Sequence, residues 1–233
     1  RYYQVVYAGQ DPQTDGTWGA IRLTAAGAGY TPMAPPLRLD RRFDGEFGAV
    51  LAAVLQGNNG GLGSGADGVH VLQADGTWQS LYLDAAGVWR ETTGVASSCT
   101  LPAGTGFWLV RAGATPVQFA FTGPVGNDGT QTNRLVTDWN LIGLSEGRDL
   151  PLVQTLASAQ PAGGASAATS DQLVIRNPDG TWRRLMYANG WGGVHAGKWF
   201  DLSSFEVVST NEVLAPGAAC YYLRRGSAAN VRF

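Results

Sequence analysis

Apolar and polar residues alternate along most of this chain, which predicts short β-strands. Val69 and Val71, for example, alternate with His70 and Leu72. A period of two places successive side chains on opposite faces of a strand. The same alternation predicts strands over residues 3–7 and 117–121, and the apolar run 107–111 reads as a central strand.

Two stretches depart from this alternation and predict short helices. The first covers residues 40–56, where Asp44 is a candidate N-cap and the apolar side chains recur with a helical period. The second follows Asp149, with Pro151 in its first turn. The apolar stripe of the first helix consists of Phe47, Val50, Leu51, Val54 and Leu55.

A repeated tetrapeptide reveals the organisation of the chain. Asp-Gly-Thr-Trp occurs at residues 75–78, at 179–182 and, a third time, at 15–18. Asp-Gly is a hairpin signal, because both residues tolerate a positive φ. Longer segments around the motif also correspond between the two halves. We therefore predict an all-β protein of two tandem homologous units, residues 1–116 and 117–233, each a β-sandwich or barrel-like sheet with one short helix.

Composition agrees with this picture and excludes some partners. The chain has 33 glycines among 233 residues, 10% aromatic residues and only 15% charged residues, which favours many turns joining short strands. The net charge of −2 argues against nucleic-acid binding, which depends on an excess of Lys and Arg that contact phosphates. The longest apolar run, residues 47–55, is too short to cross a membrane, so we expect no transmembrane segment.

Several of these segments together resemble a known class of proteins. They are Trp139-Asn140-Leu141-Ile142-Gly143, the Asp-Gly-Thr-Trp motif, the sequence Leu-Pro-Ala-Gly-Thr-Gly-Phe-Trp at 101–108, and Phe-Ala-Phe-Thr-Gly at 119–123. The pattern resembles secreted, Trp/Gly-rich tandem β-repeat proteins of environmental bacteria. The resemblance implies an exported, extracellular or cell-surface protein and supplies no catalytic residues. The first unit departs from it at residues 33–36, Met-Ala-Pro-Pro.

The sequence offers little for catalysis or for a cofactor. It contains no Gly-x-Ser-x-Gly elbow, His-Glu-x-x-His, Cys-x-x-Cys or phosphate-binding loop. We therefore expect no enzymatic activity and no cofactor. The carboxylate pairs Asp44/Glu46 and Asp11/Asp15 are better explained as a helix cap and turn residues than as a glycosidase pair. Calcium at Asp11/Asp15 or at Asn127–Asp128 is a further candidate.

The tryptophans and cysteines each allow two interpretations. Exposed rings would form a platform for stacking on sugars, whereas buried rings would belong to cores. The two cysteines, Cys99 and Cys220, are not repeat equivalents; they form either a disulfide between the units or buried free thiols. The candidate glycan-stacking residues are Trp78, Trp182, Trp191 and Trp199, with Trp89 in the same class.

The two terminal strands suggest a function through assembly. Tyr3, Val5 and Tyr7 open a strand with no predecessor, and Val231 and Phe233 end one with no successor. They either pair within their own units or complete the sheet of a neighbouring copy, which would build a head-to-tail filament. We therefore expect an exported, non-enzymatic structural protein, a surface or filament subunit that binds itself; the alternative is a carbohydrate-binding module for cell-surface glycan.

Overall fold

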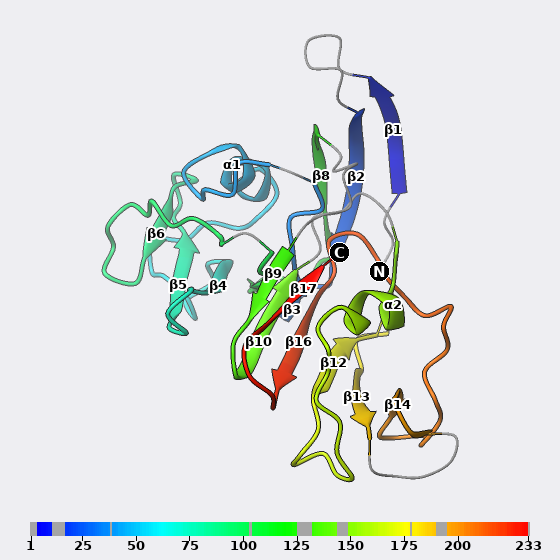
Figure 1. Ribbon diagram of the computed structural model, residues 1–233. Helices are drawn as coiled ribbons and strands as arrows, with labels where there is room; N and C mark the ends of the chain where they lie inside the picture. The colour runs from blue at the N-terminus through cyan, green and yellow to red at the C-terminus, as the bar shows by residue number, and fades with distance from the viewer. Residues whose placement is uncertain are drawn as a thin grey trace. The chain divides into compact units, whose positions relative to one another are not determined.

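The computed structural model describes residues 4–10, 17–37, 39–102, 104–124, 132–143, 149–177, 179–189 and 195–232 (Figure 1). These residues form antiparallel sheets and two small helices, which confirms the all-β class with one short helix per unit. The chain divides into two compact units. The first comprises residues 1–127, 143–147 and 216–218, and the second comprises 128–142, 148–215 and 219–233.

The first unit is organised around a five-stranded sheet of order β3-β7-β4-β5-β6. The turn at residues 75–78 joins β4 to β5, and Leu72 pairs with Trp78 across it. The predicted hairpin is therefore present. The bounds are β3 (Gly29–Met33), β4 (Gly68–Leu72), β5 (Trp78–Leu83), β6 (Trp89–Glu91) and β7 (Phe107–Arg111).

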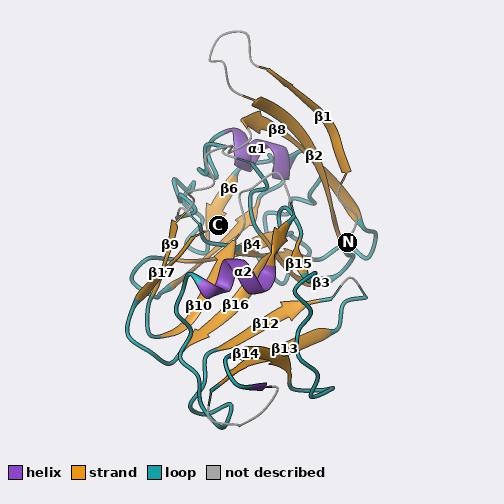
Figure 2. Cartoon of the chain, turned by 45° about the vertical axis from the view of Figure 1, so that its right-hand side comes forward, coloured by secondary structure: helices purple, strands orange, loops and turns teal. Residues whose placement is uncertain are grey.

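The second unit repeats this sheet in the order β10-β16-β12-β13-β14, whose strands run side by side in Figure 2. Each strand takes the place of one strand in the order of the first sheet, so the duplication predicted from the motif is also a duplication of topology. The bounds are β10 (Asp138–Gly143), β12 (Gln172–Arg176), β13 (Trp182–Ala188), β14 (Lys198–Asp201) and β16 (Ala219–Arg224).

The remaining strands form smaller sheets, and none of the sheets in the described part of the chain closes into a barrel. β8 pairs along β2 in the first unit, although the sequence repeat placed residues 117–123 at the opening of the second. These sheets are β1 (Gln4–Gln10), β2 (Thr17–Ala25) and β8 (Val117–Pro124); β9 (Thr132–Leu135) with β17 (Ala229–Arg232); and β11 (Leu150–Pro151) with β15 (Val213–Leu214).

The first helix is shorter than the sequence indicated, and the second lies where the sequence predicts it, after Asp149. α1 covers Glu46–Ala52 and α2 covers Leu152–Ala157. The predicted cap was wrong: Gly45 is the N-cap of α1 without a side-chain hydrogen bond, whereas Asp44 pairs with Arg42 (Oδ1–Nε 3.4 Å). Neither helix is long and apolar enough to cross a membrane.

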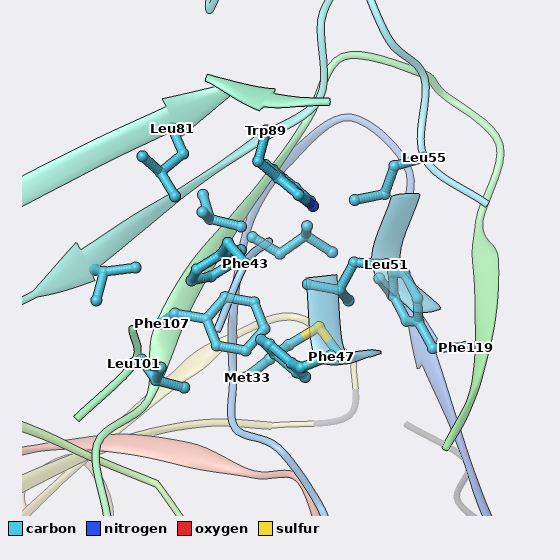
Figure 3. Packing of buried hydrophobic residues seen from close by; sticks show 14 of the residues in the cluster. Met33, Phe43, Phe47, Leu51, Leu55, Leu81, Trp89, Leu101, Phe107 and Phe119 are labelled. Carbon is cyan, nitrogen blue, oxygen red and sulfur yellow. The ribbon is translucent and has the colours of Figure 1, made fainter. Parts of the chain in front are cut away.

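Aromatic rings fill the core of the first unit (Figure 3). Phe43 meets Phe47 and Trp89 edge to face, with ring centroids 5.5 and 5.3 Å apart. The indole N–H of Trp89 donates to the backbone carbonyl of Gly48 at 2.9 Å, which ties β6 to α1. A side chain at position 48 would meet the carbonyl oxygen of Phe43 at 1.8 Å, so only glycine permits this approach.

Each unit also contains a buried ion pair at equivalent positions. Asp67 pairs with Arg111 in the first unit (Oδ2–Nε 3.0 Å), and Asp171 pairs with Arg224 in the second (Oδ2–Nη1 2.7 Å). The carboxylates precede β4 and β12, and the arginines end β7 and β16. Because these carboxylates also accept backbone N–H groups, they hold the loop after each helix against the sheet.

Candidate functional site

The Asp-Gly-Thr-Trp turns have the same geometry in both units. Asp75 Oδ1 accepts hydrogen bonds from Thr77 N at 2.9 Å and from Thr77 Oγ1 at 2.7 Å, and Asp179 accepts the same pair from Thr181 at 2.9 and 2.6 Å. These bonds lower the pKa of each aspartate. The glycines take φ of +85° and +88°, the left-handed region. The motif is therefore a structural turn that starts β5 and β13 on a tryptophan.

Those two tryptophans lie at the surface. Trp78 is 45% exposed and Trp182 is 47% exposed. Trp89 and Trp199, on β6 and β14, are instead buried in the cores of their units. Trp199 therefore cannot stack on a sugar, which corrects that part of the prediction. Trp191, the fourth candidate, lies outside the described residues.

Trp78 belongs to an aromatic surface on the outside of the first sheet. Tyr30 on β3, 56% exposed, stacks on His70 (centroids 5.9 Å apart, planes at 15°) and meets Trp108 edge to face at 6.2 Å. Cross-strand pairing connects Trp108 to His70 and His70 to Ser80, which shares its face of β5 with Trp78. We call Tyr30, His70, Trp78 and Trp108 the first outer face.

Polar groups accompany these rings. His70 Nδ1 and Ser80 Oγ are 2.7 Å apart and hydrogen-bonded. Partial burial lowers the pKa of His70, so its ring is neutral near pH 7 and has both a donor and an acceptor nitrogen. The first outer face thus combines flat apolar rings with neutral hydrogen-bonding groups.

The second unit carries the counterpart of this surface. Trp139 on β10, 42% exposed, meets Tyr221 edge to face at 5.8 Å. Tyr221 pairs with Val174, and Arg176 pairs with Trp182, so these side chains share one face of the sheet. We call Trp139, Trp182 and Tyr221 the second outer face. Exposed rings therefore recur at equivalent positions in both units.

Sequence reasoning found only part of these faces. It singled out the two turn tryptophans but missed Tyr30, Trp108, Trp139 and Tyr221. The signal was available in the alternation: Trp108 stands between Phe107 and Leu109, which both point into the core. An aromatic residue flanked in this way must point outward.

The carboxylates with resolved shifts are held in their ionised form. Burial alone would raise the pKa of Asp201, but hydrogen bonds from Ser203 and Arg183 outweigh it and lower the pKa to about 2. The pKa of Asp84 is also lowered, mainly by the Val88 N–H. A general acid needs the opposite shift, so these groups serve turns and strand edges.

The metal and carboxylate candidates gain no geometric support. Within the described ranges, no three His, Cys, Asp or Glu side chains are grouped to hold a metal ion. The calcium candidates Asp11/Asp15 and Asn127–Asp128 fall outside those ranges. Of the proposed glycosidase pair, Asp44 is engaged by Arg42 and Glu46 begins α1.

Cys99 and Cys220 are buried free thiols, one in each unit. Of the two alternatives that the sequence left open, the structure therefore has the free thiols and not the disulfide. Gln73 Nε2 donates to Cys99 Sγ at 3.5 Å, and burial raises the pKa of that thiol. Cys220 lies on β16, where its neighbour Tyr221 faces outward and it faces inward. Packing within separate units accounts for both residues.

The candidate assembly strands are described in part. β1 contains Val5 and Tyr7 and pairs with β2, with an irregularity between these two residues. Val231, which is buried, pairs with Asn133 on β9. Tyr3 and Phe233 lie outside the described residues. Both terminal strands therefore pair with a strand of their own unit.

No family model, curated protein or solved structure matches this chain. Functional inference therefore depends on the surfaces themselves. The two outer faces present flat rings beside hydrogen-bonding groups, an arrangement suited to a ligand with apolar faces and polar edges.

Proposed function

We propose that this chain is an exported, non-enzymatic protein whose two outer faces bind carbohydrate at the bacterial cell surface. The observation that carries the proposal is the recurrence of exposed aromatic rings at equivalent positions in both units. Contiguous patches of exposed apolar groups mark interaction sites on soluble proteins. Their presence in both copies favours a role in binding.

The chemistry of sugars fits these faces. A pyranose ring has C–H groups on its flat faces and hydroxyls around its edge. The C–H groups can stack on the rings of Tyr30 and Trp78. The hydroxyls can form hydrogen bonds with His70 and Ser80. The rings extend over β3, β7, β4 and β5, and three spacings between neighbouring strands amount to about 14 Å, enough for a short oligosaccharide.

Replacing the exposed tryptophans should weaken binding to a soluble glucan. We expect Trp78→Ala and Trp182→Ala each to lower the affinity of their own face about two- to tenfold, by analogy with the roughly 0.5–1.5 kcal/mol that a pair of stacked aromatic rings contributes. Affinity electrophoresis through gels containing hydroxyethylcellulose measures the effect. Phe205→Ala is the matched control, because Phe205 is 60% exposed in the loop after β14 and belongs to neither outer face.

Two results would count against this function. One is undiminished retardation of the Trp78→Ala/Trp182→Ala double variant. The other is an equal loss in the Phe205→Ala control, which would indicate nonspecific adhesion of exposed rings.

Head-to-tail assembly is a second candidate, supported by the strand edges. Among the described residues, β1 pairs only with β2, and β17 pairs only with β9. Each of these strands therefore has an edge without a strand partner, and such edges pair readily with another chain. The sheet of β9 also has two strands where its counterpart in the first unit has three.

Deleting residues 1–10 should abolish this assembly, because it removes β1 and its free edge. Light scattering at increasing protein concentration would show a growing particle mass for the full chain and a constant monomer mass for the deletion variant. A monomer in both samples, or identical growth in both, would refute assembly through β1.

A further inference from the structure

Two arginines accompany the exposed tryptophan of the second outer face. Arg176 lies directly opposite Trp182 across β12 and β13, and Arg184 lies two residues along β13 from Trp182 on the same face. Neighbouring strands are about 5 Å apart, and alternate residues of one strand are about 7 Å apart. Trp182, which is 47% exposed, therefore has one arginine beside it across the sheet and another along its own strand.

The first outer face has no charged residue at these two positions. Leu72 lies opposite Trp78, and Ser80 lies two residues along β5 from Trp78. Each turn contributes one aspartate, Asp75 or Asp179, so these carboxylates do not distinguish the two faces. The two outer faces therefore share exposed rings and differ by the positive charges of two arginines.

A buried glutamine holds Arg184 at the surface of the sheet. The Arg184 Nε–H donates to the side-chain carbonyl oxygen of Gln172, whose own amide donates to the carbonyl of Ala167. Within the described ranges no carboxylate pairs with Arg184, whereas Arg183, on the opposite face of β13, pairs with Asp201. The other N–H groups of the Arg184 guanidinium can bind a carboxylate through two parallel hydrogen bonds.

Arg176 adds a second positive charge at the turn before β13. Its Nε–H donates to the backbone carbonyl of Gly180 at 3.4 Å. A carbonyl acceptor does not neutralise a guanidinium, so the charge of Arg176 still attracts an anion bound on Trp182. The surroundings of Trp182 thus favour a ligand that combines a flat apolar ring with negative charge.

We propose that the second outer face binds an acidic glycan, whose sugar rings carry carboxylates, more tightly than a neutral glycan. Because this preference rests on the proposed carbohydrate binding, it assigns a ligand class to one of the two faces. A glucuronate ring has the same C–H faces for stacking as glucose, and it has a carboxylate at its edge in place of a hydroxymethyl group. With the ring stacked on Trp182, the carboxylate pairs with Arg184, and Arg176 strengthens the attraction.

Two hexasaccharides test this preference, because they share a backbone and differ only at C6. One is the hexamer of β-1,4-linked glucuronate, and the other is cellohexaose. NMR titration of the full chain reads each face separately through the indole N–H resonances of Trp78 and Trp182, which the two alanine variants identify. At low ionic strength the Trp182 resonance should report about three- to tenfold tighter binding of the acidic hexamer, the gain typical of one or two exposed ion pairs. The Trp78 resonance should report no such preference.

Salt and two variants test whether the arginines cause the preference. In about 1 M sodium chloride, where the Debye length is about 3 Å, the preference at Trp182 should disappear. Arg184→Gln should reduce the preference about twofold or more, because it removes one of the two charges. Arg134→Gln is the matched control, since it removes an exposed arginine from β9, a strand of another sheet in the same unit, and should leave the preference intact.

The outcomes separate this preference from carbohydrate binding itself. Binding of cellohexaose at Trp182 with equal or weaker binding of the acidic hexamer would overturn the preference and leave the proposed carbohydrate binding standing. An equal preference at Trp78, an undiminished preference in Arg184→Gln, or an equal loss in Arg134→Gln would also overturn it. Binding of neither hexamer at either face would overturn both.

Discussion

Replacing Asp171 by alanine should lower the free energy of unfolding of the second unit by about 3–5 kcal/mol, the usual cost of breaking a buried ion pair at one partner. The carboxylate is fully buried and accepts from the Arg224 guanidinium and the Tyr222 hydroxyl, both at 2.7 Å. It also accepts from the backbone N–H groups of Ala162 and Arg225. Alanine would leave these donors buried without an acceptor.

Hydrogen–deuterium exchange of peptides from β12 and β13 measures this loss within the second unit. Asp67→Ala is the informative comparison, because its effect should fall in the first unit. We expect a smaller cost there, since no tyrosine in the described part of the chain donates to Asp67 and Arg111 Nε has no well-aligned hydrogen bond at its 3.0 Å separation. A loss below 1 kcal/mol for Asp171→Ala would contradict the structural role of the pair.

Trp89→Ala should destabilise the first unit by about 3–5 kcal/mol, the range for deleting a large aromatic side chain from a core. The ring is 3% exposed, packs edge to face on Phe43, and donates to the carbonyl of Gly48. Its removal creates a cavity and releases α1 from β6. Urea unfolding followed by circular dichroism measures the change.

Trp78→Ala is the matched control for Trp89→Ala, because both tryptophans belong to the same sheet. Trp78 is 45% exposed, and a surface substitution of this kind usually changes stability by less than about 0.5 kcal/mol. Equal destabilisation by the two changes would refute the assignment of Trp89 to the core and Trp78 to the surface. Comparing the Trp78→Ala and Trp89→Ala variants also separates an effect on stability from an effect on ligand binding.

Much of the fold follows from the sequence, because its strands and turns are determined locally. The strand predicted at residues 107–111 is β7, and the Asp-Gly turns join the predicted hairpins. The helix predicted over residues 40–56 forms only at 46–52. Arg42 bridges Asp40 and Asp44, and Arg42 pairs with Thr100, so this segment takes an extended and turn conformation before the helix.

The sites were harder to predict, because exposure depends on strand pairing across the sheet. Trp182 and Trp199 both lie near the start of a strand, yet Trp182 faces solvent and Trp199 faces the core. Alternation within one strand does not reveal which face the helix covers. A cavity beside Trp199 was also hidden, because it depends on the placement of α2 against β14, which are far apart in the sequence.

The most direct test of carbohydrate binding by duplicated faces is calorimetric titration of the full chain with cellohexaose. The repeated geometry predicts two sites per chain, of which one is weakened in each of the Trp78→Ala and Trp182→Ala variants and both are weakened in the double variant. Two sites of unchanged affinity in the double variant, or no binding by the full chain, would contradict the proposal.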